Sequence, residues 1–143
     1  MKTKVSIGND HAGTDLKFKV MDRLAAQFEF VNHGTDVEDS VDYPDYVHPV
    51  ADDVTSGRSA FGILICGSGN GVCMTANKHQ GVRAGLAWTP EIAALTKQHN
   101  NANVICIPAR FLSEEEAFQV LQAYLDAEFE GGRHQRRVDK IPC

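Results

Sequence analysis

The run from Phe61 to Gly71 joins an apolar segment to a thiol, Cys66, and then to alternating glycines. Glycine at every second position lets backbone N–H groups converge on one point without a side chain in the way, so such a loop can hold an anion. If a helix begins near Val72, the partial positive charge at its start favours a phosphate, an oxyanion or a thiolate at the same point. Cys66 is therefore a candidate catalytic thiol.

This glycine loop differs from three better-known phosphate loops. Its spacing is G-x-G-x-G instead of the dinucleotide-binding G-x-G-x-x-G, and it lacks the lysine and the Ser/Thr of a P-loop. A cysteine phosphatase would have an arginine where Val72 stands. A tight turn without a ligand remains the alternative, although three glycines in five residues cost backbone entropy on folding.

Two further polar groups could take part in a site. Asp10 and His11 follow the first apolar segment, and His99 opens the polar run 99–103. Simpler interpretations are an exposed turn for the first group and a helix end capped by asparagine for the second. If the first group lies beside Cys66, a ligand site is the better interpretation.

Positive charge gathers in the C-terminal segment 133–140, although the chain has a net charge of -5. Arg133 and Arg137 are four residues apart, so on a helix they would share one face and could grip a phosphate between two guanidinium groups. Gly131–Gly132 mark a break that could let residues 131–143, the C-terminal arm, reach another surface. A solvated charged terminus is the simpler interpretation.

Length and composition limit the possible classes. The 143 residues, 43% of them hydrophobic, predict a single domain over 1–143 with a core of its own. We see no apolar run long enough for a membrane span and no signal-peptide core, so we expect a cytoplasmic protein. The net negative charge disfavours nucleic acid as a partner. Without a C-x-x-C pair, the four cysteines predict neither disulfides nor a zinc site.

Apolar segments alternate with helical patterns along the chain. Five strands are expected, at 4–8, 28–31, 61–66, 82–87 and 102–107. Helix starts are expected where capping residues or a helix-opening proline occur, at Thr14, Pro44, Thr89–Pro90 and Ser113–Glu116.

Strands that alternate with helices predict an α/β protein with a five-stranded parallel sheet covered on both faces. We expect the flavodoxin-like strand order 2-1-3-4-5, in which the loops 9–13 and 66–71 face each other at the carboxyl edge. His99 precedes the fifth strand and would lie at the amino edge. It could meet Cys66 only if a symmetric dimer brings one subunit's His99 to its neighbour's thiol.

Several longer motifs occur in one order along nearly the whole chain. They are Asp10–Gly13, Asp42–Tyr46, Cys66–Gly71, Ala76–Lys78, His99–Asn103 and Glu130–His134. With them the chain resembles the type B ribose-5-phosphate isomerase family, which includes galactose-6-phosphate and allose-6-phosphate isomerases and four-carbon relatives. The resemblance implies a Rossmann-like three-layer sandwich, dimers or tetramers with shared active sites, and aldose–ketose isomerisation without a metal or other cofactor.

The resemblance also implies roles for individual residues. Cys66 would move the proton between C1 and C2, and His99 would open the sugar ring. Asp10 and Ser68 would be catalytic with them. Substrate binding would involve His11, Tyr43, Gly67, Gly69, Asn70, Gly71, Asn100, Arg110, Arg133 and Arg137, with His11 and the three arginines at the phosphate.

Three positions vary within this pattern. Some family members use a glutamate four residues beyond the cysteine as base, but Asn70 stands there in this chain, so the thiol must serve. Ser68 replaces a common threonine and keeps the hydroxyl. Asn101 replaces a frequent aspartate, which removes a charge beside His99.

The expected function is conversion of ribose 5-phosphate to ribulose 5-phosphate through ring opening and a cis-enediol intermediate. Alternatives are isomerisation of allose 6-phosphate, galactose 6-phosphate or erythrose 4-phosphate, or a non-catalytic module that binds a phosphorylated ligand. The expected partners are a phosphorylated sugar and a second copy of the chain, as a homodimer or a dimer of dimers, with no membrane and no nucleic acid.

Overall fold

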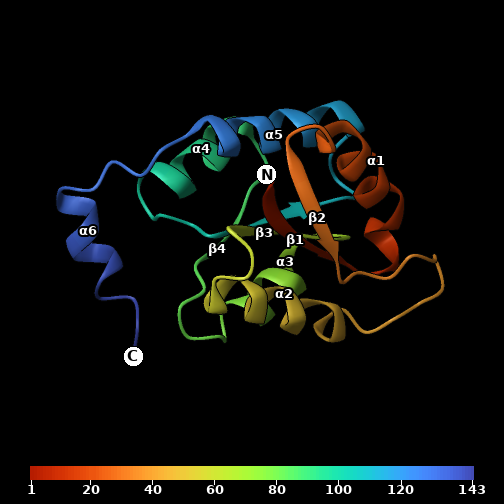
Figure 1. Cartoon of the computed structure of the whole chain (residues 1–143), viewed down its shortest axis with the longest axis horizontal. Helices are drawn as coiled ribbons and strands as arrows, with labels where there is room; N and C mark the ends of the chain where they lie inside the picture. The colour runs from red at the N-terminus through yellow and green to blue at the C-terminus, as the bar shows by residue number, and fades with distance from the viewer.

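A five-stranded, all-parallel sheet forms the centre of the computed structural model, which describes residues 1–143 (Figure 1). Its strands are β1 (Thr3–Asn9), β2 (Phe28–Asn32), β3 (Phe61–Cys66), β4 (Ala84–Leu86) and β5 (Val104–Pro108). Helices cover both faces, so the predicted α/β three-layer architecture is confirmed.

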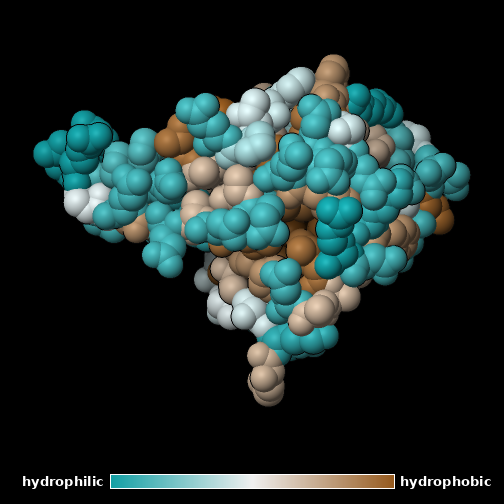
Figure 2. Space-filling model, turned by 90° about the horizontal axis from the view of Figure 1, so that it is seen from above, coloured by the Kyte–Doolittle hydropathy of each residue, from teal (hydrophilic) through white to brown (hydrophobic).

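Helices α1, α4 and α5 pack on one face of the sheet, and α2 and α3 on the other (Figure 1). The six helices are α1 (Thr14–Leu24), α2 (Pro44–Ser56), α3 (Asn70–Ala76), α4 (Pro90–Gln98), α5 (Glu114–Asp126) and α6 (Arg133–Val138), with a 3-10 turn at His11–Gly13. Helix α6 stands away from the body on the C-terminal arm, whose surface is mostly hydrophilic (Figure 2). None of the helices has the length and apolar character needed to cross a bilayer.

The central strands place alternate side chains in two separate cores. In β3, Ile63 and Ile65 join the core beneath α1, α4 and α5, while Leu64 and Cys66 join the core beneath α2 and α3. This follows from the two-residue period of a strand. Cys66 therefore ends its strand on the side of α2 and α3.

The strand order is β2-β1-β3-β5-β4, so the predicted order 2-1-3-4-5 is wrong in its last two positions. β5 is buried at every residue and is suited to a central position, whereas the three residues of β4 are each only half-buried. Asn77 protects the exposed edge: its side-chain amide donates to the carbonyl of Ala84 (2.9 Å) and accepts from the Ala84 N–H (2.8 Å). The two outward backbone groups of Ala84 are therefore not available to pair with a further strand.

Two predicted helix starts are confirmed by their caps. The Thr89 hydroxyl accepts from the N–H of Ile92 (3.2 Å), and Ser113 forms a reciprocal capping box with Glu116. Thr14 differs, because it is the first residue of α1 and Gly13 occupies the cap position. Its hydroxyl instead donates to the Val37 carbonyl (2.8 Å), which ties the loop after β2 to α1.

The Asp53 carboxylate lies at the centre of a buried polar network that links α2 to the sheet. It accepts from the Ser6 hydroxyl (2.7 Å) and from Arg58 Nε (2.8 Å), and it lies 2.6 Å from His33 Nε2. Burial alone would raise the pKa of Asp53, but these hydrogen bonds outweigh burial and lower the pKa to about 2. The ionised carboxylate therefore stabilises the native state.

This network predicts a loss of stability in acid. A native pKa below the unfolded value means that the Asp53 contribution is complete above about pH 4 and is lost as the pH falls toward 2. Urea unfolding followed by circular dichroism should show this fall in the free energy of unfolding. Asp53→Asn should be less stable at pH 7, and its free energy of unfolding should fall less between pH 4 and 2. Asp52→Asn, on the same helix but exposed, is the matched control, and an equal fall in all three proteins would contradict the assignment.

Candidate active site

The carboxyl ends of three adjacent strands bring several predicted residues together. β1, β3 and β5 are neighbours, and each continues into a loop at the same edge. The N–H of Asp10 donates to the Ile65 carbonyl (3.3 Å), the N–H of Ala109 to the Cys66 carbonyl (2.9 Å) and the N–H of Arg110 to the Gly67 carbonyl (3.0 Å). The loops that carry Asp10, Cys66 and Arg110 are thus hydrogen-bonded to one another.

Cys66 is the last residue of β3 and is 5% exposed. The loop after it turns sharply into α3, and Gly69 adopts a left-handed backbone with φ of 78°. A Cβ at Gly69 would lie 2.4 Å from the Leu86 side chain, so only glycine fits. The Ser68 hydroxyl accepts from the N–H of Asn70 (3.3 Å), which holds the loop closed at the start of the helix.

The other two loop glycines make room for neighbouring side chains. A Cβ at Gly71 would lie 2.5 Å from the ring of Tyr43, and one at Gly67 would lie 3.2 Å from the Arg110 side chain. Tyr43 and Arg110 therefore pack directly on the backbone of the loop. A ligand over this loop would therefore have a phenol and a guanidinium close to it.

Asp10 and His11 complete this group at the end of β1. The Asp10 carboxylate is buried, and its Oδ1 accepts from the N–H of Ala12 (3.0 Å). The Nδ1 of His11 accepts from the N–H of Val41 (3.2 Å), so a neutral His11 carries its proton on Nε2. That nitrogen can donate to a phosphate or a sugar hydroxyl.

The remaining predicted residues form a second group at the opposite edge. His99 caps the C-terminal end of α4, directly after Gln98, and Asn100 and Asn101 lead from it to the amino end of β5. In the β3–β5 ladder Gly62 pairs with Val104 and Cys66 with Pro108, so the two edges lie about 13 Å apart along the strands. Asn101 has a left-handed φ of 49°, which asparagine tolerates better than most residues.

Arg133 and Arg137 belong to this second group, because both lie on α6 of the C-terminal arm. The arm is tied to α4 through Glu130, whose N–H donates to the Gln98 carbonyl (3.0 Å). The chain thus carries two groups of candidate residues, which we call half-sites. The thiol half-site contains Asp10, His11, Tyr43, Cys66–Gly71 and Arg110, and the histidine half-site contains His99, Asn100, Arg133 and Arg137.

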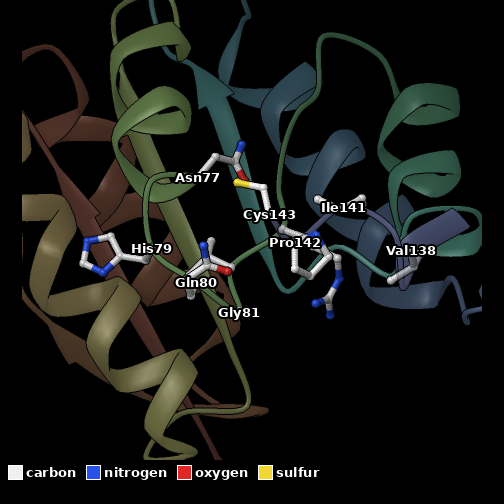
Figure 3. Close-up of a pocket in the computed structure, with 10 residues that line it drawn as sticks. Asn77, His79, Gln80, Gly81, Val138, Ile141, Pro142 and Cys143 are labelled. Atoms are coloured by element: carbon white, nitrogen blue, oxygen red, sulfur yellow. The ribbon is translucent and has the colours of Figure 1, made fainter.

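Two hollows of the single chain involve the C-terminal arm, and Cys66 lines neither of them. One of about 100 Å³ is lined by the turn 79–83 and by Val138 and Ile141–Cys143 (Figure 3). A second, of about 340 Å³, includes Asn100 and Ile141. We place the candidate site at the thiol half-site, because its residues combine a thiol, a carboxylate and a guanidinium, whereas no Asp or Glu side chain lines either hollow.

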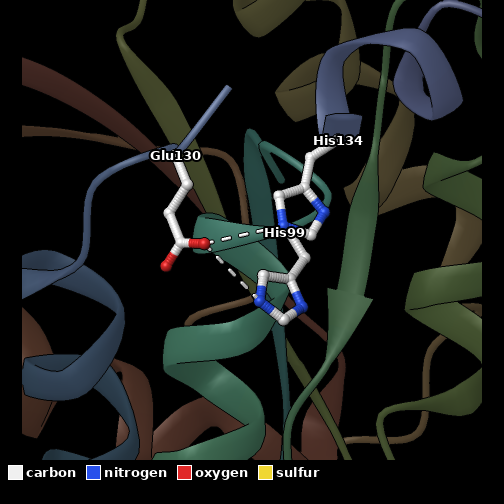
Figure 4. A group of neighbouring side chains, drawn as sticks. All are labelled: His99, Glu130 and His134. Atoms are coloured by element: carbon white, nitrogen blue, oxygen red, sulfur yellow. Dashed lines mark ion pairs between the residues drawn. The ribbon is translucent and has the colours of Figure 1, made fainter. Parts of the chain in front are cut away.

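Glu130 and His134 are two neighbours of His99 that were not among the predicted site residues. The Oε1 of Glu130 lies 3.8 Å from the Nε2 of His99 and 3.5 Å from the Nε2 of His134 (Figure 4). Glu130 lies before α6 and is separated from His134 by Gly131 and Gly132, so their four-residue spacing is not a helical one, and the sequence carried no signal for their contact with His99.

Similarity to known proteins identifies the family of this chain. A family model described as Ribose/Galactose Isomerase matches residues 5–141 of the chain. The chain belongs to this family. A ribose-5-phosphate isomerase B from Escherichia coli is 40% identical to it over 96% of this chain and 93% of its own length.

Two solved structures of family members have the same fold. The ribose 5-phosphate isomerase of Thermotoga maritima is 43% identical, with a TM-score of 0.95 over 99% of both chains. The ribose-5-phosphate isomerase B of Mycoplasma genitalium, solved with bound ribulose-5-phosphate, is 45% identical, with a TM-score of 0.93 over 99% of this chain and 95% of the other.

Proposed function

We propose that this protein is a cofactor-independent aldose–ketose isomerase that interconverts ribose 5-phosphate and ribulose 5-phosphate. The observation that carries the proposal is the thiol of Cys66 at a glycine loop, with the Asp10 and Arg110 loops hydrogen-bonded beside it. The chain's membership of a family with a ribulose-5-phosphate-bound member supports the choice of substrate.

Ring opening is the first step, because ribose 5-phosphate is mostly a furanose in water. In the proposed step, His99 as an imidazolium gives a proton to ring oxygen O4 while the C1–O4 bond breaks. The electron pair of that bond goes to O4. Asp10 takes the proton of the anomeric hydroxyl, and the C1–O1 bond becomes a carbonyl. A histidine suits this role because its ordinary pKa lies near neutrality.

Proton transfer between carbons follows on the open chain. The Cys66 thiolate takes the proton from C2 to give a cis-enediolate and then returns it to C1. The hydroxyl proton moves from O2 to O1 by way of Asp10 and Ser68. Backbone N–H groups of the glycine loop are suited to stabilising the developing oxyanion, a contribution of about 3 to 4 kcal/mol for each well-aimed donor.

The phosphate is proposed to lie between the two half-sites. Arg110 and His11 would contact it from the chain that supplies the thiol, and Arg133 and Arg137 from the chain that supplies His99. A phosphate takes no part in bond breaking here, so these contacts serve binding and alignment of the reacting carbons.

We propose that a homodimer, or a dimer of such dimers, assembles each complete site from two chains. The two half-sites lie at opposite edges of one sheet, which supports this assembly. Trp88 and Phe111, which follow β4 and β5, are exposed by 45% and 59% and pack on each other with centroids 5.0 Å apart. A second copy over this carboxyl edge would bury them.

The four free thiols suit the reducing cytoplasm, which is the proposed location of this protein.

A panel of aldose phosphates tests the proposed function. The purified protein is assayed with ribose 5-phosphate, allose 6-phosphate, galactose 6-phosphate and erythrose 4-phosphate, and kcat/KM is compared across them. We expect the highest value for ribose 5-phosphate. Binding without turnover of any of them would indicate a non-catalytic module, and a higher kcat/KM for another sugar would change the assigned substrate.

Removal of one phosphate contact should affect binding more than chemistry. Arg137→Ala is expected to raise KM for ribose 5-phosphate about tenfold or more with a smaller change in kcat, because it removes a charged contact to a non-reacting group. Steady-state kinetics measures both constants. Arg136→Ala, on the same exposed helix, is the matched control. An unchanged KM for Arg137→Ala would mean that the phosphate binds elsewhere.

A further inference from the structure

Glu130 and His134 are direct neighbours of His99, although neither takes part in the proposed ring opening or proton transfer. One carboxylate oxygen of Glu130 faces the Nε2 atoms of both histidines, at 3.8 Å for His99 and 3.5 Å for His134. The two imidazole rings stack with centroids 4.2 Å apart and planes inclined by only 10° (Figure 4). The proposed ring-opening histidine thus has a carboxylate and a second ring as direct neighbours.

The backbone holds this group in place. The N–H of Glu130 donates to the carbonyl of Gln98, the residue before His99. Gly131 and Gly132 then adopt φ values of 66° and 56°, which other residues rarely adopt, and turn the chain into α6. The N–H of His134 donates to the Gly131 carbonyl (3.0 Å), so its ring comes back over His99. Two backbone contacts and two left-handed glycines therefore define the arrangement.

A carboxylate shared by two stacked rings is better suited to holding protons than to holding a metal ion. The three potential ligand atoms lie within 4.8 Å of one another. The nitrogen lone pairs, however, lie in the ring planes, and nearly parallel planes direct them side by side instead of toward one central ion. Both Nε2 atoms instead face Glu130, as N–H donors to a carboxylate would.

His134 is suited to packing against a charged neighbour. Its side chain is 11% exposed, compared with 39% for His99. Burial lowers the pKa of His134, and the charges of His99, Arg133 and Arg137 lower it further against the opposing effect of Glu130. A neutral His134 ring can therefore stack on His99 without adding a second positive charge.

We propose that Glu130 is a positioning residue for ring opening: its carboxylate orients the His99 ring through Nε2 and stabilises the imidazolium that gives its Nδ1 proton to the sugar. This rests on the proposed isomerase function. The proton goes from Nδ1 to ring oxygen O4, and His99 is left neutral with its remaining proton on Nε2, opposite the carboxylate. Hydrogen bonds of this kind are often long without substrate and shorten in the complex.

The two directions of the reaction separate ring opening from proton transfer between carbons. Ribose 5-phosphate closes into a furanose through O4. Ribulose 5-phosphate has its C5 oxygen blocked by phosphate, so it cannot form a five-membered ring and reaches the enzyme already open. Its product can leave as the open aldehyde and close in water. A residue that serves only ring opening is therefore needed only when ribose 5-phosphate is the substrate.

The test compares Glu130→Gln with Glu128→Gln, which makes the same change of charge two residues away, and with the unmodified protein. Initial rates are measured separately with ribose 5-phosphate and with ribulose 5-phosphate. We expect Glu130→Gln to lower kcat about tenfold or more with ribose 5-phosphate, as weakening of a general acid would. Its kcat with ribulose 5-phosphate should stay within about twofold, and Glu128→Gln should match the unmodified protein in both directions.

Other outcomes are equally decisive. An equal loss in both directions would assign Glu130 to the enediol step or to the fold, and no loss in either direction would remove it from catalysis; both overturn the inference. Inactivity of the unmodified protein in both directions would instead contradict the proposed function.

Discussion

Replacing Cys66 by alanine is expected to abolish interconversion of ribose 5-phosphate and ribulose 5-phosphate. The thiolate is the proposed base at C2, and Asn70, at the position of an alternative glutamate base, cannot accept that proton. Loss of a positioned base should lower kcat about 10³-fold or more. The measurement is kcat in both directions, together with exchange of the C2 proton for deuterium from the solvent, which should also stop.

Folding should survive this change, because it removes one sulfur atom at the end of a strand and leaves the backbone contacts of the loop. Thermal unfolding of Cys66→Ala checks this. Cys73→Ala is the matched control, since that half-buried thiol lies on α3 and donates to the Ala84 carbonyl outside the proposed chemistry. Near-full activity of a folded Cys66→Ala variant would exclude the thiol as base.

Replacing His99 by alanine is expected to produce a defect that depends on the direction of the reaction. Turnover of ribose 5-phosphate should fall about 100-fold, because furanose opening loses its general acid, and the residual rate should reflect the open-chain fraction in solution. Turnover of ribulose 5-phosphate should fall much less. Initial rates in the two directions measure the difference. Equal losses would place His99 in the enediol step.

The same two variants test whether a site is shared between chains. Neither Cys66→Ala nor His99→Ala alone has a complete site for ribose 5-phosphate. When the two are unfolded together and refolded, half of the dimers should be mixed, and each mixed dimer regains one of its two sites. About a quarter of the unmodified activity should therefore return. No recovery, despite formation of mixed dimers, would mean that both residues act within one chain.

Much of the thiol half-site could be predicted because it depends on local sequence. The apolar run 61–66 predicts a strand by itself. The glycines after it and the polar turn at Asp10 each follow a strand, and strands 1 and 3 pair in either strand order. Their meeting at one edge is confirmed by the hydrogen bond from Asp10 to Ile65. Caps at Thr89 and Ser113 were predictable for the same reason, since a cap involves residues only three apart.

The order of β4 and β5 in the sheet could not be predicted from either segment alone, because it depends on which of the two is more fully buried. Both segments looked apolar, but only residues 104–108 are buried throughout, whereas 84–86 are half-buried and include a glycine. The contacts of Glu130 and His134 with His99 could not be predicted from the sequence for a similar reason. They depend on how the arm returns to the end of α4, which the conformations of Gly131 and Gly132 decide.

The observed strand order has a consequence for how substrate length is selected. Cys66 ends β3 and Arg110 follows β5, and these strands are direct neighbours joined by a hydrogen-bonded ladder. The spacing between Cys66 and Arg110, the proposed phosphate contact, is therefore set by the sheet. The other proposed phosphate contacts, Arg133 and Arg137, lie on an arm beyond two glycines. A change in the arm would therefore move the proposed phosphate position, and with it the sugar length that fits, while the sheet and its thiol stay the same.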